Sequence, residues 1–292
     1  MWILFAAGSA VFAGLTAILT KIGVKNTDST LATAIRTTVV LAFSWLLVLL
    51  IGSHTGLAAL QPKTWLFLCL SGAATGLSWL CYCKALQLGD VNKVTPIDKS
   101  STLLTMLIAF LWLGEPVTGW KLAGMAAIAV GTAAMLTPPS AVPHAPSAPA
   151  GNKRWLLYAV LSAVFASLTS ILGKIGIQGV ESNLGTAIRT LVVFVIAWLL
   201  VFAGGKQRQL GAIDRRSWLF LLLSGTTTGL SWLCYYRALQ DGPASVVAPI
   251  DKLSILVTVA FAAVWLKERL SKKAAIGLAL LTGGTLLLLV PA

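Results

Sequence analysis

Long apolar runs separated by short polar loops account for almost the whole chain. A helix needs about 20 mostly apolar residues to cross the hydrocarbon core of a bilayer. Ten runs come close to this length, and they lie at 2–23, 31–51, 65–86, 94–113, 120–137, 155–176, 184–203, 218–239, 246–266 and 273–290. The pattern predicts an all-α membrane protein with ten transmembrane helices.

The composition agrees with a membrane location. Hydrophobic residues make up 57% of the 292 residues and charged residues only 11%, whereas about a quarter of a soluble domain is charged. The net charge of +13 would suggest nucleic-acid binding in a soluble protein, but here the basic residues fall largely in short loops between apolar runs. We therefore expect membrane lipid around the protein and no nucleic-acid partner.

The second half of the chain repeats the first. Adding 153 to a residue number in the first half gives its counterpart in the second, so that 75–105 returns almost unchanged as 228–258. The two units are 1–137 and 153–292, and a linker rich in Pro, Ala and Ser, 138–152, joins them. Because five helices is an odd number, we predict two inverted-topology five-helix repeats, an arrangement that many secondary transporters share.

Ionisable side chains inside the apolar runs are the main clue to function. A charge costs about 2.5 to 3.5 kcal/mol at the centre of a membrane helix, so these side chains should face a cavity, one another or the membrane surface. From their places in the runs, we expect one set at each of two opposite mouths of the molecule. The first set is Lys21, Arg36, Lys84, Asp98 and Lys99, and the second is Lys174, Arg189, Arg237, Asp251 and Lys252.

Some of these charges have a structural explanation that competes with a functional one. Lys21 and Lys84, like their repeat partners, are close enough to helix ends to snorkel to the lipid headgroups. Asp98 and Asp251 each follow a proline by two residues, which predicts that each lies in the first turn of a helix. They are either proton-coupling groups or counter-charges, for example with Asp98 paired to Arg36.

Aromatic residues accompany the charges. Trp79 with Tyr82, and Trp232 with Tyr235, lie three residues apart and therefore on one helix face, where they either line a substrate path or pack helices together. The candidate substrate-binding or coupling residues are Arg36, Trp79, Tyr82, Lys84, Asp98, Lys99, Arg189, Trp232, Tyr235, Arg237, Asp251 and Lys252.

Short motifs recur in the same order in both units. A Tyr-x-x-Ala-Leu run is followed by a Leu and a Glu, then by two glycines, at Leu113, Glu115, Gly124 and Gly131 and again at Leu266, Glu268, Gly277 and Gly284. Over essentially the whole chain this order resembles the EamA family of the drug/metabolite transporter superfamily. The resemblance implies a ten-helix transporter with a central cavity between its halves, often an exporter of amino acids, metabolites or drugs. We expect a bacterial inner membrane as its location.

The sequence favours a secondary active transporter. It has no nucleotide-binding P-loop, so a proton gradient or a counter-substrate would have to drive transport. The excess of cationic side chains favours a small-molecule substrate with a carboxylate or phosphate. The alternatives are an exporter of cationic drugs or amines, a narrow channel, and a membrane-embedded lipid-modifying enzyme. The apolar runs contain no His and no nucleophile motif, so we expect no enzymatic activity, cofactor or metal.

Loop charges and the family resemblance predict opposite orientations. The side that bears the linker carries twelve basic residues in its loops, namely Lys25, Lys93, Lys153, Arg154, Lys206, Arg208, Arg215, Arg216, Lys267, Arg269, Lys272 and Lys273. The other side has Lys63 and Lys121. The positive-inside rule therefore predicts a cytoplasmic linker and termini that face out. The resemblance implies termini in the cytoplasm.

Overall fold

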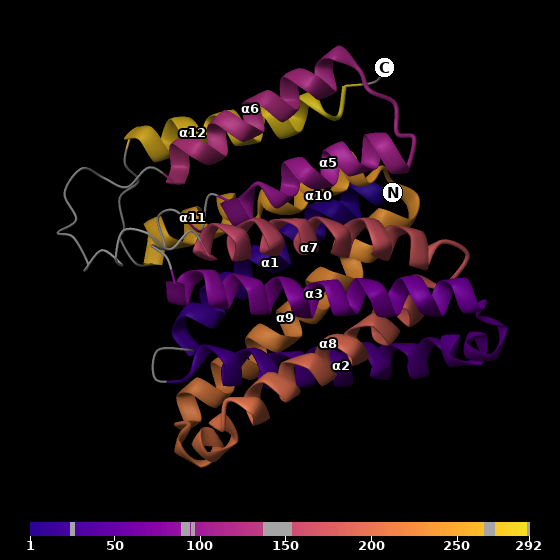
Figure 1. The fold of residues 1–292 in the computed structure, drawn as a ribbon, viewed down its shortest axis with the longest axis vertical. Coiled ribbons are helices and arrows are strands. Elements are labelled where there is room, and N and C mark those ends of the chain that lie inside the picture. Colours follow the sequence, from indigo (N-terminus) through magenta and orange to yellow (C-terminus); the bar gives the residue numbers. More distant parts are fainter. Residues whose placement is uncertain (24–26, 89–93, 95–96, 137–153, 266–271, 291–292) are drawn as a thin grey trace.

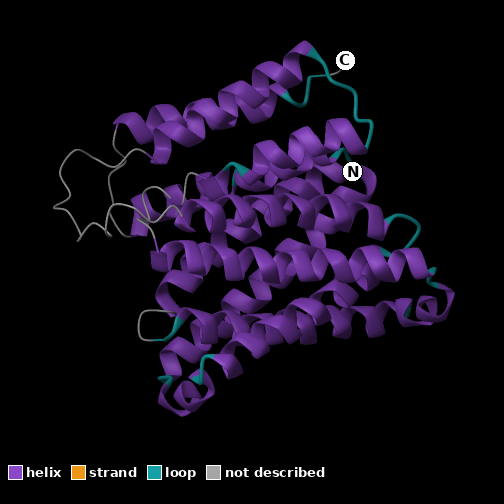
Figure 2. Ribbon diagram, in the orientation of Figure 1, coloured by secondary structure: helices purple, strands orange, loops and turns teal. Residues whose placement is uncertain are grey.

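The computed structural model describes residues 1–23, 27–88, 94, 97–136, 154–265 and 272–290, and helices dominate throughout (Figure 2). The helices of the first repeat are α1 (Trp2–Gly23), α2 (Ser29–Ile51), α3 (Pro62–Leu88), α5 (Ser101–Trp112) and α6 (Gly119–Leu136). Those of the second are α7 (Arg154–Ile177), α8 (Ser182–Ala203), α9 (Arg215–Asp241), α10 (Ala244–Lys252), α11 (Ser254–Trp265) and α12 (Lys272–Leu287). The linker, Pro96, Glu268 and the side chain of Lys21 lie outside the described part, so the predictions made for them stay predictions.

Equivalent residues begin the second helix of each repeat. Asp28 caps α2 by accepting hydrogen bonds from the N–H groups of Thr30 and Leu31, and Glu181 caps α8 in the same way. Burial acts to raise the pKa of Asp28, but the Lys206 ammonium 2.8 Å away and the two N–H donors outweigh it, so the pKa lies below its usual value. The short 3₁₀ helices η1 (Ser53–Ala59) and η2 (Lys206–Ala212) then follow α2 and α8.

The fourth apolar run of the second repeat is broken, although the sequence predicted one helix over 246–266. It forms α10 and α11, which meet at Leu253, and Pro249 lies inside α10. Proline there lacks an N–H and so disturbs the helical turn that precedes it. At the break the chain makes a tight turn, in which the N–H of Leu253 donates to Ile250 O at 2.9 Å. The equivalent bond in the first repeat, from Ser100 to Ile97, is 3.1 Å long, and α5 begins directly after it.

This break corrects the position of the aspartate. Asp251 was expected in the first turn of its helix, but α10 begins at Ala244 and Asp251 lies in its last turn. At 1.5 Å per residue the carboxylate is about 10 Å along the helix, well inside the molecule. Helices that are interrupted beside ionisable residues are typical of transporter binding sites.

Within the described residues, six helical stretches are long and apolar enough to cross a membrane, judged by length and composition alone. They are Trp2–Thr20, Ser29–Ile51, Pro62–Tyr82, Arg154–Ile177, Ser182–Ala203 and Ala244–Phe261. The chain is therefore an all-helical membrane protein. By contrast, α5 has only 12 residues, so it spans about 18 Å and cannot cross a bilayer alone.

The two repeats are interlocked, because their helices pack mainly across the repeat boundary. The first helix of each repeat lies along the third helix of the other, so α1 packs on α9 and α7 on α3 (Figure 1). Glycines permit a close approach of α3 to α8, since a Cβ at Gly72 would lie 2.7 Å from the carbonyl oxygen of Arg189. The same is true of α9 and α2, where a Cβ at Gly225 would lie 2.6 Å from Cβ of Val39.

The last helices of the two repeats, α6 and α12, form a pair at the top of Figure 1. A Cβ at Gly124 would lie 2.6 Å from the carbonyl oxygen of Gly284, and one at Gly131 would lie 2.7 Å from that of Gly277. These four glycines belong to the recurring motifs of the sequence, and their role is to let the two helices touch. α12 also packs against α10, so the pair lies beside the broken fourth run of the second repeat.

Candidate functional site

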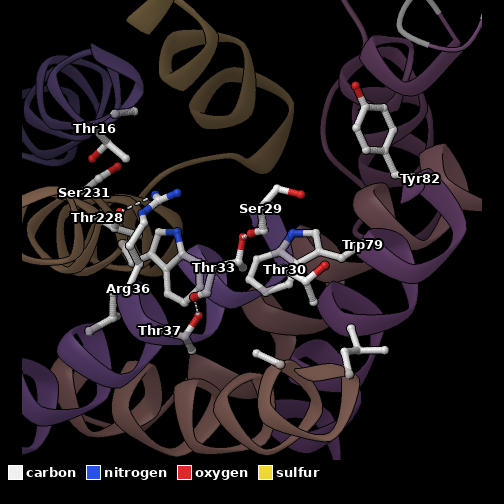
Figure 3. Close-up of a pocket in the computed structure, with 15 residues that line it drawn as sticks. Thr16, Ser29, Thr30, Thr33, Arg36, Thr37, Trp79, Tyr82, Thr228 and Ser231 are labelled. Carbon is white, nitrogen blue, oxygen red and sulfur yellow. Dashed lines mark hydrogen bonds between the residues drawn. The ribbon is translucent and has the colours of Figure 1, made fainter. Parts of the chain in front are cut away.

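A cavity of about 610 Å³ lies between α1, α2, α3, α8 and α9 (Figure 3). One face of α2 supplies much of its polar lining, because Ser29, Thr30, Thr33, Arg36 and Thr37 recur at helical spacing. Val40 of α2 also lines the cavity, and from the other helices come Ala13, Thr16, Trp79, Tyr82, Ala197, Leu200, Thr228, Ser231 and Trp232. The lining thus combines hydroxyl groups, one guanidinium and three large aromatic rings. It offers binding groups to a small organic molecule.

Arg36 is held at one end of its guanidinium and is free along another edge. Its Nη2 donates to Thr228 Oγ1 at 2.9 Å (Figure 3). Thr228 in turn donates to Ser224 O at 2.7 Å. Its Nε is buried and has no hydrogen-bond partner within the described part of the chain. A buried charged donor without a partner is costly, and an anionic group in the cavity would satisfy it.

The repeat partner of this residue, Arg189, is enclosed instead. Only 1% of Arg189 is exposed, and its Nη2 and Nε donate to Thr75 at 2.7 Å and to Ser71 at 3.3 Å. Its guanidinium carbon also lies 5.0 Å from the ring centre of Trp232 and 4.4 Å from that of Tyr236. Both arginines therefore bind an equivalent threonine of the other repeat, but only Arg36 faces a large cavity.

A second cavity of about 300 Å³ adjoins the first on the Arg189 side. It contains Tyr235, Asp251 and Lys252, and it shares Ala13, Trp79, Ser231 and Trp232 with the larger cavity. The two tryptophans, one from each repeat, thus lie where the cavities meet. The aromatic candidates line both cavities, with Tyr82 in the larger and Tyr235 in the smaller.

Each candidate aspartate is bound by a serine of the opposite repeat. Ser9 donates to Asp251 Oδ1 at 2.6 Å, and Ser162 donates to Asp98 Oδ1 at 2.8 Å. Ser231 and Ser78 extend these contacts, since each hydroxyl bonds to its neighbouring serine. One of the two alternatives for the aspartates, an ion pair between Asp98 and Arg36, is therefore not formed among the described residues: Asp98 accepts from Ser162, and Arg36 donates to Thr228. The serines were missed in the sequence, although all four are identical between the two units.

The lysines that follow the aspartates come together. Lys99 and Lys252 line a third cavity, of about 230 Å³, with Thr132 of α6 and Thr285 of α12. Lys252 Nζ also lies 3.9 Å from Asp251. The expectation of one charged set at each of two opposite mouths is thus wrong for these groups, because both lysines line one shared cavity.

Two candidates lie away from these three cavities. Lys84 and Arg237 are exposed near the ends of α3 and α9. Arg237 pairs with Asp241 at 3.5 Å and donates to Gln240 at 3.2 Å. These contacts agree with the snorkelling interpretation of the two residues.

The comparison with family models decides the identity of the chain. The model described as "EamA-like transporter family" matches residues 1–137 and 153–290, which are the two repeats. The chain belongs to this family. It is thereby an EamA-like transporter of the drug/metabolite transporter superfamily.

Similar proteins agree with this assignment. The "Uncharacterized transporter in cobO 3'region" of Sinorhizobium sp is 42% identical over 139 residues, which are 48% of this chain and 99% of the relative. "Uncharacterized protein MJ1333.1" of Methanocaldococcus jannaschii is 27% identical over 133 residues, 46% of this chain and 94% of the relative. Each relative is therefore about as long as one repeat of this EamA-like transporter.

A solved structure shows the same fold. The chain described as "Crystal structure of protein" superimposes with a TM-score of 0.78, and the match covers 97% of this EamA-like transporter and 95% of the solved chain. Only 19% of the residues are identical, so the likeness concerns the fold alone.

Proposed function

We propose that this EamA-like transporter is a secondary active transporter that moves a small organic anion, with a carboxylate or phosphate group, by alternating access. The observation that carries the proposal is Arg36, which lines a cavity of about 610 Å³ while its buried Nε has no hydrogen-bond partner in the described residues. Hydroxyl groups of Thr33 and Thr37 line the same cavity and can bind further substrate oxygens.

The difference between the two arginines supports alternating access. Two repeats with related sequences hold Arg36 beside a large cavity and Arg189 in an enclosed site. If the repeats exchange these conformations, Arg189 becomes accessible when Arg36 becomes enclosed. Substrate would then meet equivalent groups from either side of the membrane.

The proposed topology is ten transmembrane helices in two inverted repeats. α1 begins beside the N-terminus, whereas its counterpart α7 begins at the opposite end of the molecule (Figure 1). The short helices α10 and α11 follow each other directly, so together they are long enough to act as one span. We place the protein in a bacterial inner membrane and favour export.

The aspartates are the proposed coupling groups. Asp251 lines the second cavity between Ser9 and Lys252, where a proton or a counter-substrate would change the local charge. A gradient of that ion or solute would supply the energy.

A second candidate is export of a cationic drug or amine, which the aromatic rings of Trp79, Tyr82 and Trp232 in the large cavity favour. Proteoliposomes loaded with lactate, inorganic phosphate or tetraphenylphosphonium separate the two. We expect saturable counterflow of an anion and none of tetraphenylphosphonium. Counterflow of the cation alone would overturn the anion assignment, and no flux with any member of a wider anion and cation panel would overturn transport.

The orientation is a further prediction, based on the loop charges. Of the two basic residues on the side without the linker, Lys121 is buried and donates to Pro116 O, which strengthens the charge asymmetry. In a cysteine-free background, Thr55→Cys in η1 should react with a membrane-impermeant maleimide on intact cells, and Ser147→Cys in the linker should react only after lysis. The reverse pattern would place the termini in the cytoplasm.

A further inference from the structure

Glu115 joins the two repeats at the start of α10. Glu115 follows the end of an apolar run, where a charge can lie at the membrane surface, but this side chain is only 8% exposed. Its two carboxylate oxygens accept hydrogen bonds from the N–H groups of Ala244, at 2.6 Å, and Ser245, at 3.0 Å. Glu115 lies between α5 and α6 of the first repeat, whereas these N–H groups begin α10 of the second.

The carboxylate replaces a cap that α10 lacks. The N-cap position is Pro243, whose side chain has no oxygen and makes no capping hydrogen bond. Unpaired N–H groups at a helix start are costly when buried, and they attract a negative charge. Glu115 therefore satisfies a requirement of the second repeat with a group of the first.

Further polar contacts close the same end. Lys174 near the end of α7 lies 4.0 Å from Glu115 and donates to the carbonyl oxygens of Leu239, at 3.2 Å, and of Gly242. Gln240 donates to the carbonyl oxygens of Ile177 and Val180, at 3.0 and 2.6 Å. The α5–α6 loop, the end of α7 and the α9–α10 joint are thus fastened together.

These contacts fasten α10, the helix that carries two candidate site residues. α10 ends in Asp251 and Lys252, which line the second cavity beside Arg189. Any movement that opens this end to solvent by parting α10 from the α5–α6 loop must break both hydrogen bonds to Glu115.

We propose that Glu115, supported by Lys174, is the gate residue that keeps the Arg189 end of the path closed. The inference rests on the proposed alternating access. Its carboxylate holds α10 against the first repeat in the closed state and releases it when that end opens. Glu115 is a positioning residue in this role, since it does not line any of the three cavities described above.

The chain offers a matched control in Glu181. Glu181 also caps a helix with its carboxylate, accepting from the N–H groups of Asn183 at 3.0 Å and Leu184 at 2.9 Å. It belongs to the same repeat as the helix that it caps, so it does not fasten the repeats together. A purely local capping role for Glu115 would make the two residues behave alike.

The test measures a distance across the enclosed end and needs no substrate. Spin labels are attached at two exposed positions, Gly119→Cys at the start of α6 and Gln178→Cys after α7. The protein is full-length, otherwise free of cysteine, and reconstituted in nanodiscs. In Glu115→Gln the charge is lost and one acceptor remains, so we expect about a 10-fold rise in the population with the longer distance. Glu181→Gln should leave the distance distribution unchanged.

Two outcomes would overturn the gate. The first is a distance distribution for Glu115→Gln that equals that of the wild type. The second is a shift in Glu181→Gln that is as large as the shift in Glu115→Gln. If gel filtration shows that Glu115→Gln does not fold, Lys174→Gln takes its place, because this variant keeps the helix cap. An unchanged distance distribution in Lys174→Gln would then count against the gate. A shifted distance in a protein that moves no anion would sustain the gate and refute the anion assignment.

Discussion

Replacing Arg36 with glutamine is expected to weaken binding of the transported anion by about 10- to 150-fold, because a hydrogen bond to a charged group contributes about 1.5 to 3 kcal/mol. Glutamine can still contact Thr228 but cannot offer a charged Nε to the cavity. The KM for counterflow in proteoliposomes should rise while the folded yield stays close to that of the wild type.

Two companion variants make this result specific. Arg36→Lys keeps the charge but not the fork of donors, so it should recover only part of the affinity. Arg237→Gln removes an exposed guanidinium that pairs with Asp241 on the same helix, and it should leave KM unchanged. An unchanged KM in Arg36→Gln would remove this residue from the binding site.

Neutralising Asp251 is expected to abolish gradient-driven flux while exchange of substrate continues. Asparagine retains an oxygen that can accept the hydrogen bond from Ser9, so the local structure should persist. The negative charge 3.9 Å from Lys252 is lost, however, and with it the group that would take up a proton. Flux driven by an imposed pH gradient, measured beside counterflow, separates coupling from binding.

The equivalent variant should behave likewise, since Asp98 accepts from Ser162 in the same way. Asp241→Asn is the control, because Asp241 is an exposed acid at the end of α9. Normal gradient-driven flux in well-folded Asp98→Asn and Asp251→Asn would assign both carboxylates a structural role only.

Much of the fold could be predicted, because the lengths of the apolar runs determine where the membrane helices form. The predicted run 2–23 has the same bounds as α1, and the ends of α2 and α8 were placed within two residues. The break at Leu253 escaped prediction, since neither leucine nor the equivalent Ser100 interrupts a helix by itself. Pro249 did signal it, but a proline near the start of an apolar run predicts a helix start equally well.

The types of residue in the candidate site could be predicted from the sequence, but their hydrogen-bond partners could not. Arg36 and Asp98 could be singled out because charges are rare in membrane helices. Their partners, Thr228 and Ser162, lie in the other repeat, and hydroxyl residues are too common in such helices to stand out. Pairing across repeats follows from three-dimensional packing, which periodicity does not report. For Glu115 the usable signal was Pro243, a helix start without a capping side chain.

The exchange of helix partners between repeats has a consequence for biosynthesis. When the first repeat leaves the ribosome, Ser9 and Arg36 enter the membrane before Asp251 and Thr228 have been made. The early helices must therefore wait in the bilayer with these polar groups unmatched, and neither half can reach its final packing before the other has been inserted. The last helices to be synthesised complete the assembly of the first, so the maturation of this protein is a late event that involves the whole chain.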